Sequence, residues 1–357
     1  MTTIGWMLTR MILVRFIGIL LGITVFVLSL EVISQVKEIL ALDKDSAVIM
    51  FRYFFMRSPS TLATYLPMSM LLAILLALTE LSYRNEITAI WAAGISPRRL
   101  IIMLLPLAFV TGGINFLLND QAIPAAAPQL REWGIGDYDQ KRLKLGERDP
   151  IWMRSGTDIL RAASSNSQST LLDDVTIFRR EPSGILREQI AAKRAELKGT
   201  RWELTDVIVY HRENLPPVHL DNLVYSGAMK PAAAGARSGD PEEMTNSDLN
   251  YFIANSGFGI RPIWVYQTWW QKRISLAFAT LVMITVCIPM ATRFRRGGGL
   301  GLLFATGVGL GFLFFVTDGI ALTMGELGFV NPWMAAWMPV LSFGALATAL
   351  SLRTDRV

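Results

Sequence analysis

The sequence predicts an α-helical polytopic membrane protein with six transmembrane helices and one inserted, jellyroll-like all-β domain. Of the 357 residues, 52% are apolar and only 18% are charged, an imbalance that is unusual for a soluble chain of this length. The apolar residues also gather into runs long enough to cross a hydrocarbon core of about 30 Å as helices, which takes roughly 20 residues. The six runs span residues 11–33, 60–81, 100–118, 274–292, 300–322 and 333–352.

The stretch between the third and fourth runs has the charge density of a soluble domain. We therefore divide the chain into residues 1–118, an inserted domain over 119–271, and residues 272–357. Short segments with β character, separated by Gly184 and Gly199, favour an all-β sandwich or jellyroll in the insertion. These segments are 158–162, 175–179, 189–197, 202–204 and 207–211.

The end of the inserted domain contains a polar stretch followed by aromatic residues. Residues from about 226 to 246 contain too few apolar side chains to offset the entropy of ordering, so we expect a mobile loop there. Leu249, Phe252 and Ile253 then recur at helical spacing. The aromatic residues that follow are expected to anchor the chain at the membrane interface, and they are Trp264, Tyr266, Trp269 and Trp270.

The basic residues near the ends of the runs indicate the orientation in the membrane. Short cytoplasmic loops are enriched in Lys and Arg, whereas long domains are translocated regardless of their charge. We therefore expect both termini in the cytoplasm and the inserted domain on the other side of the membrane, which in a Gram-negative cell is the periplasm. The arginines that fall on the cytoplasmic side are Arg10, Arg15, Arg84, Arg98, Arg99, Arg293, Arg295, Arg296, Arg353 and Arg356.

The sequence contains no recognisable catalytic or metal-binding motif. His211 and His219 have no second ligand at the spacing of a zinc site, and Cys287 is the only cysteine. No Walker A sequence is present, so we expect no bound ATP and no other cofactor in this chain, and no nucleic-acid partner.

Gly307 and Gly311 lie inside a predicted span, where small residues let helix backbones approach closely.

A separate short helix, at about 85–94, is predicted between the second and third spans. Asn85 is placed to cap its start, Glu86 suits the positive end of its dipole, and Gly94 is placed to end it. Ser96 and Pro97 then begin the next helix as cap and first position. Ile87, Ile90 and Trp91 make a narrow apolar face, which suits either a groove in a partner protein or the membrane surface.

The segment "LSYRNEITAIWAAGIS" resembles the coupling segment of the LptF/LptG permeases, and the resemblance extends over essentially the whole chain. "WWQKRI" is similar to the start of the family's fourth span, and "FLFFVTDGIALTMGELGFVNPWMAAWMP" to its last hairpin. The placement of Asp318 and Pro332 is nearer to the LptG branch. The chain departs from the family at Leu276, where a proline is frequent, and in having Glu31 and Glu38 beside Lys37.

The resemblance implies an ABC transporter that takes lipopolysaccharide from the inner membrane for outer-membrane biogenesis. In that family, two permeases form a heterodimer on a dimer of the LptB ATPase, and the cargo leaves through periplasmic jellyrolls. The expected partners are therefore an LptB-type ATPase dimer, a second LptF/LptG-type permease, LptC-type and LptA-type periplasmic proteins, and lipopolysaccharide. ATP hydrolysis would occur on the partner subunit, so this chain is not expected to be an enzyme.

The resemblance also implies roles for particular residues. Glu86 is expected to transmit motion from the ATPase, with Arg84, Ile87, Ile90 and Trp91 completing the contact. Lys37 matches a family position for binding lipopolysaccharide, and Lys44 is a second candidate near it. Ordinary snorkelling fits Lys37 equally well, and it is the favoured interpretation for Lys44, Arg52 and Arg57. Gly307 and Gly311 are assigned to a gate or packing face, and Asp318, roughly 27 Å into its span, to a gate near the outer interface.

A different class of function is a membrane-anchored scaffold or binding protein that docks a periplasmic partner without transport. Such a protein has no need of an ATPase contact between its second and third spans. The predicted cytoplasmic helix therefore favours the transporter.

Overall fold

The computed structural model describes residues 3–40, 46–135, 151–165, 170–181, 183–199, 201–212, 215–226, 241–254, 261–293 and 300–354. The chain forms two compact units. One contains Met1–Ile123 and Gln271–Val357, and the other contains Pro124–Trp270, which compares with the 119–271 assigned from the sequence. Lys44 and most of the predicted loop, residues 227–240, lie outside the described ranges.

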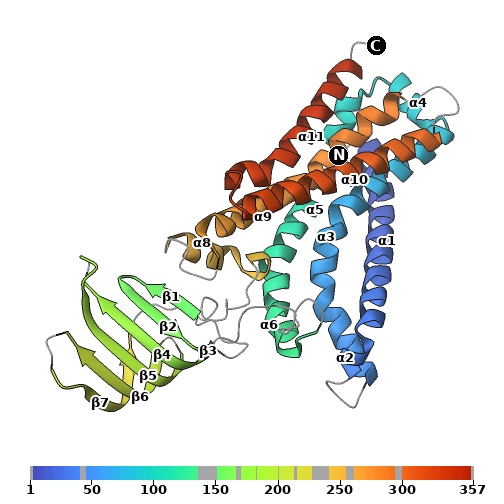
Figure 1. The fold of residues 1–357 in the computed structure, drawn as a ribbon. Helices are drawn as coiled ribbons and strands as arrows, with labels where there is room; N and C mark the ends of the chain where they lie inside the picture. The colour runs from blue at the N-terminus through green and yellow to red at the C-terminus, as the bar shows by residue number, and fades with distance from the viewer. Residues whose placement is uncertain are drawn as a thin grey trace. The chain divides into compact units, whose positions relative to one another are not determined.

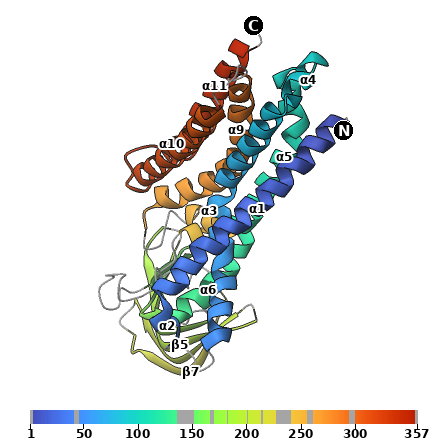
Figure 2. The same cartoon turned by 90° about the vertical axis from the view of Figure 1, so that its right-hand side faces the viewer.

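Among the described residues, six helices are long and apolar enough to cross a membrane, which confirms the predicted number of spans. In both views α1 lies beside α3 (Figure 1, Figure 2). Each helix contains one of the predicted runs or ends within a residue of it. The helices are α1 (Thr3–Ser34), α3 (Ser46–Tyr83), α5 (Pro97–Leu117), α9 (Ile263–Arg293), α10 (Leu300–Glu326) and α11 (Pro332–Thr354).

Shorter helices connect the spans. The helix α2 (Val36–Leu40) follows α1, and α4 (Glu86–Ala92) connects α3 to α5. Beyond α5 the backbone continues as a π-helix, η1 (Leu118–Ala122), and then as α6 (Ile123–Trp133). A π-helical turn inside an otherwise α-helical segment often marks a functional site, because it re-aims the side chains that it carries.

The residues predicted to begin and end α4 do so with one correction. Gly94 has a positive φ of 78°, and Ser96 caps α5 by accepting a hydrogen bond from the Arg99 backbone N–H at 3.4 Å. Asn85, however, makes no side-chain capping hydrogen bond. Its backbone is left-handed, with φ of 59°, whereas a capping residue is usually extended. The sharp turn between α3 and α4 requires this conformation, which asparagine tolerates better than most residues.

The second unit contains one antiparallel sheet in the described residues. Consecutive strands pair in the order β1-β2-β4-β5-β6-β7, with β3 paired to β4. An inserted β domain is thereby confirmed. Its meander order differs from that of a two-sheet jellyroll, since the described strands contain no crossover between sheets. The strands are β1 (Ile151–Ser155), β2 (Asp158–Ala162), β3 (Ser164–Ser165), β4 (Leu171–Arg180), β5 (Leu186–Lys198), β6 (Arg201–His211) and β7 (Val218–Tyr225).

Three neighbouring strands share a kink at the same level of the sheet. In β4, β5 and β6 the buried side chains are separated by two residues where strict alternation would leave one. Asp174 and Asp206 lie at this level with positive φ angles of 47° and 56°. Extra residues of this kind bend strands and increase their twist. The buried pairs that flank the kink are Leu172 and Val175, Ala192 and Ala195, and Leu204 and Val207.

The core of the second unit includes aromatic residues that the sequence assigned to the membrane interface. Tyr266 is only 1% exposed and stacks on Phe252 at 4.7 Å between ring centroids, while Trp269 and Trp270 pack against the same cluster. Phe252 belongs to α8 (Asn246–Ala254), which confirms the helical spacing seen there. The residues before α8, Pro241–Glu243, form the short 3-10 helix η3 within the predicted loop. These aromatics therefore close a β-sheet core.

A glycine allows a close approach between two helices of the first unit. A Cβ atom on Gly112 of α5 would lie 2.2 Å from the backbone oxygen of Ala277 on α9, whereas one on the neighbouring Gly113 would meet nothing within 4 Å. Because the obstructing atom is backbone, a side chain here forces the two helices apart.

Gly112→Ala is expected to destabilise the protein by about 2 kcal/mol or more, the scale of overpacking in a rigid core. Gly113→Ala is the matched control and should be neutral or stabilising by up to about 1 kcal/mol, since alanine favours helix. The thermal unfolding midpoint in detergent measures both. Equal midpoints for the two variants would show that α5 and α9 are not packed this closely.

Candidate functional site

The short helix α4 has one face packed on its own chain and one face open. Ile87 and Ile90 are 2% and 7% exposed and belong to the apolar core cluster of the first unit. Glu86, Thr88 and Ala89 are exposed, and Trp91 is half-buried. This arrangement changes the interpretation of Ile87 and Ile90, because they attach α4 to its own chain and do not face outward. The surface left for a partner centres on Glu86.

A carboxylate that the sequence analysis did not single out lies next to this helix. Glu80 of α3 forms an ion pair with Arg15 of α1 and another with Arg84, at 2.9 Å. Glu80 falls inside the predicted span at 60–81. An acid inside an apolar run is itself a sign of function, and that sign would have identified it.

The opposite ends of α1 and α3 are also joined by charge. Glu31 accepts hydrogen bonds from Arg57 Nε and from the Tyr53 hydroxyl, both at 2.8 Å. Arg57 is thus engaged within the chain, whereas Lys37 on α2 and Arg52 on α3 have exposed side chains. Lys37, the basic residue that the resemblance matches to a family position, is thus exposed on α2.

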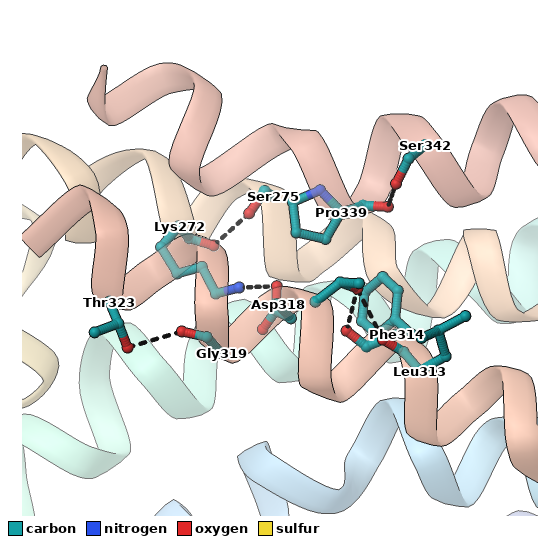
Figure 3. Close-up of polar contacts among 10 residues, drawn as sticks. Lys272, Ser275, Leu313, Phe314, Asp318, Gly319, Thr323, Pro339 and Ser342 are labelled. Atoms are coloured by element: carbon teal, nitrogen blue, oxygen red, sulfur yellow. Dashed lines mark hydrogen bonds and ion pairs between the residues drawn. The ribbon is translucent and has the colours of Figure 1, made fainter. Parts of the chain in front are cut away.

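Asp318 of α10 forms an ion pair with Lys272 of α9, and both side chains are largely buried, at 15% and 4% exposure. Figure 3 shows the Lys272 side chain reaching from α9 to Asp318, which directly precedes Gly319 on α10. Asp318 therefore has a charge partner on a neighbouring helix, which the sequence analysis did not predict. Lys272 belongs to the "WWQKRI" segment, but a single sequence does not show which of two residues 46 positions apart come into contact.

The next residue on α9 makes a second ion pair on a different helix. Arg273 is 2% exposed and pairs with Asp120 of η1, with 3.3 Å between Nη1 and Oδ1. Two asparagines just before Asp120 also make hydrogen bonds. The Asn119 side chain donates to the Asn115 backbone oxygen at 2.8 Å, and the Asn115 side chain donates to the Ala63 backbone oxygen at 3.0 Å. Two adjacent cations thus link α9 to α10 on one side and to η1 on the other.

The glycines of α10 meet a neighbouring helix of the same chain. A Cβ atom on Gly307 would lie 2.5 Å from the Leu75 side chain of α3, and one on Gly311 would lie 3.1 Å from that of Leu71. Gly309, between them, would meet nothing within 4 Å. Gly307 and Gly311 therefore allow α10 to pack closely on α3 at this point.

These observations define a class of protein, a six-span membrane protein with a β domain inserted between its third and fourth spans and with ion pairs among the spans. The family described as "Lipopolysaccharide export system permease LptF/LptG" matches residues 6–353. The chain belongs to this LptF/LptG family, and with it to the multi-pass proteins of the inner membrane.

Two relatives carry the name "Lipopolysaccharide export system permease protein LptG". The one from Haemophilus influenzae is 22% identical to this chain over 271 residues, which are 73% of this chain and 74% of the relative. The one from Escherichia coli K12 is 21% identical over 307 residues, which are 84% of each. Both similarities extend over most of this chain and of the relative.

The buried pair between Lys272 and Asp318 predicts a strong effect of breaking it. Asp318→Asn or Lys272→Met alone leaves a buried charge without its partner and is expected to lower stability by about 3 to 5 kcal/mol. The charge exchange Lys272→Asp with Asp318→Lys should recover most of that loss. Thermal unfolding in detergent measures the series, and no recovery in the exchange variant would contradict a direct pair.

Proposed function

We propose that the chain is the permease subunit of an ABC transporter that extracts lipopolysaccharide from the inner membrane and passes it to a periplasmic bridge. Membership of the LptF/LptG family over nearly the whole chain is the observation that carries this proposal. The positive-inside distribution of arginines supports cytoplasmic termini and a periplasmic β domain. No catalytic role is assigned to this chain, and ATP is hydrolysed on a separate LptB-type ATPase dimer.

The helix α4 is the proposed contact with the ATPase. It lies between the second and third spans, its apolar side chains are buried beneath it, and its exposed face presents Glu86 at the helix start. A helix anchored in this way transmits a push to the spans beneath it. In this role Glu86 and Arg84 meet the partner, Trp91 borders the contact, and Ile87 and Ile90 couple α4 to the core.

The route for the cargo involves α10, the second permease and the β domain. Of the six spans, α10 and α1 have the smallest buried shares, 22% and 28%, so their apolar faces are free for lipid or for a second LptF/LptG-type permease. Gly307, Gly311 and the Asp318 pair hold α10 on its own chain and are the proposed gate contacts. The exposed side chains Val218 and Val224 on the last strand of the sheet, β7, suit LptC-type and LptA-type partners. The Asp318 and Lys272 variants described above also test the gate, through loss of export in either single variant.

The coupling role of Glu86 predicts that Glu86→Ala abolishes ATP-driven lipopolysaccharide export while the protein still inserts and assembles. Glu86 is exposed and contributes at most about 1 kcal/mol at a helix start, so the fold should survive. Thr88→Ala, on the exposed face of the same helix, is the control and should export normally. The measurement is ATP-dependent transfer of lipopolysaccharide from proteoliposomes that contain the purified complex. Export at the wild-type rate by Glu86→Ala would contradict the proposed coupling role of Glu86.

Lys37 is proposed to bind a phosphate of lipopolysaccharide, because it is exposed and an ammonium forms charge-assisted hydrogen bonds with phosphate. Lys44 is kept as a second proposed contact on its charge alone. A photo-crosslinking amino acid at position 37 is expected to capture the glycolipid during ATP turnover, with position 26, an exposed phenylalanine of α1, as the control. Equal capture at both positions would contradict a specific site at Lys37.

A further inference from the structure

Glu80 connects two arginines that come from different helices. Its Oε2 pairs with Arg15 of α1, and its Oε1 pairs with Arg84 at the end of α3, at 2.9 Å. The Arg15 guanidinium also donates to the Met11 backbone oxygen at 3.0 Å. Glu80 thus fixes both a residue inside α1 and a residue that lies two positions before α4.

The position of Arg15 along α1 indicates where the hydrocarbon core of the membrane ends. From Arg15 to Ser34 the helix rises about 28 Å, close to the thickness of a hydrocarbon core, so the turns before Arg15 extend beyond that core. On these turns Leu8 and Ile12 are buried, whereas Trp6 is 61% exposed. The first turns of α1 therefore have one face packed on the protein and one face open.

The buried face of these turns packs in the same cluster as α4. Leu8 and Ile12 of α1 line one small apolar cavity with Ile87 and Ile90 of α4. The backbone turn between α3 and α4 is tight, because Asn85 is left-handed and its N–H bonds to the Ser82 oxygen at 3.1 Å. A movement of α4 can therefore reach α1 by two routes. One is the apolar cluster that both helices share, and the other is the ion pair between Arg84 and Glu80.

We propose that Glu80 and Arg15 are positioning residues that carry the displacement of α4 to α1. This inference rests on the proposed function, because it presumes that an ATPase moves α4. When α4 moves toward α1, the apolar cluster pushes α1 ahead of it. When α4 moves away, the Glu80 ion pairs pull α1 after it. The first span then responds to nucleotide together with the coupling helix.

The structure contains a matched control for this role. Glu31 also accepts two hydrogen bonds, also joins α1 to α3, and lies at the opposite ends of the same two helices. A purely structural role for Glu80 predicts that Glu80→Gln and Glu31→Gln behave alike. A coupling role predicts that only Glu80→Gln changes the relation between ATP hydrolysis and transport.

The experiment compares these two variants in the complete complex with its ATPase, reconstituted in proteoliposomes. Glu80→Gln is expected to hydrolyse ATP near the wild-type rate while export falls about fivefold or more, the range of a typical coupling between sites. Glu31→Gln should keep the wild-type ratio of export to hydrolysis. Arg15→Glu should resemble Glu80→Gln, since each change removes the ion pair that joins α3 to α1.

A distance measurement reads the displacement directly. Spin labels at Trp6→Cys on α1 and Leu352→Cys on α11, both exposed positions, in a Cys287→Ala background should change separation when nucleotide binds. In Glu80→Gln this change should disappear. An unchanged response in Glu80→Gln, or equal losses of hydrolysis and export in both glutamine variants, overturns the inference. A wild-type complex without ATP-dependent export overturns the proposed function itself, and the coupling role with it.

Discussion

An ionised side chain that is partly buried near the end of an apolar helix needs an opposite charge from a neighbouring helix to offset its lost hydration. The described residues of this protein satisfy that requirement with four pairs: Arg15 with Glu80, Arg57 with Glu31, Lys272 with Asp318, and Arg273 with Asp120. The first two join α1 to α3 near both ends. The last two start from adjacent residues of α9 and join it to α10 and η1.

Between these charged contacts the helices are positioned by small residues. Gly112 lets α5 approach the backbone of α9, and Gly307 lets α10 approach Leu75 of α3. The result is a central pair, α3 and α9, each with 67% of its apolar window buried, and two spans, α1 and α10, that are much less covered. Spans that are less covered by their own chain suit elements that must move while their neighbours stay in place.

Much of the fold could be predicted from the sequence, because the bilayer imposes a helix length that apolar runs reveal directly. The interior strands β2, β4, β5 and β6 were also found. The edge strand β7 was missed because six of its eight side chains are exposed, so its pattern lacks a buried face. The kink at Asp174 and Asp206 broke the alternation in three strands at once, and it split β6 into two predicted segments.

The candidate site was predicted less completely. Glu86 and Asp318 could be identified from local patterns, namely a helix start and an acid in an apolar run. Their environments could not, since Lys272 and Asp318 are 46 positions apart and Glu80 and Arg15 are 65 apart. One sequence carries no record of such pairings. The burial of Ile87 and Ile90 depends likewise on α1 and α5, which meet α4 only after folding.

The central claim is that this chain works as one half of an ATP-driven permease for lipopolysaccharide. The most direct test is to purify it from its native membranes in mild detergent and to identify by mass spectrometry the proteins and lipids that accompany it. The account predicts an LptB-type ATPase, a second six-span permease and bound lipopolysaccharide. Recovery of an intact, folded chain alone, or with periplasmic proteins only, would contradict it and would favour a membrane-anchored scaffold.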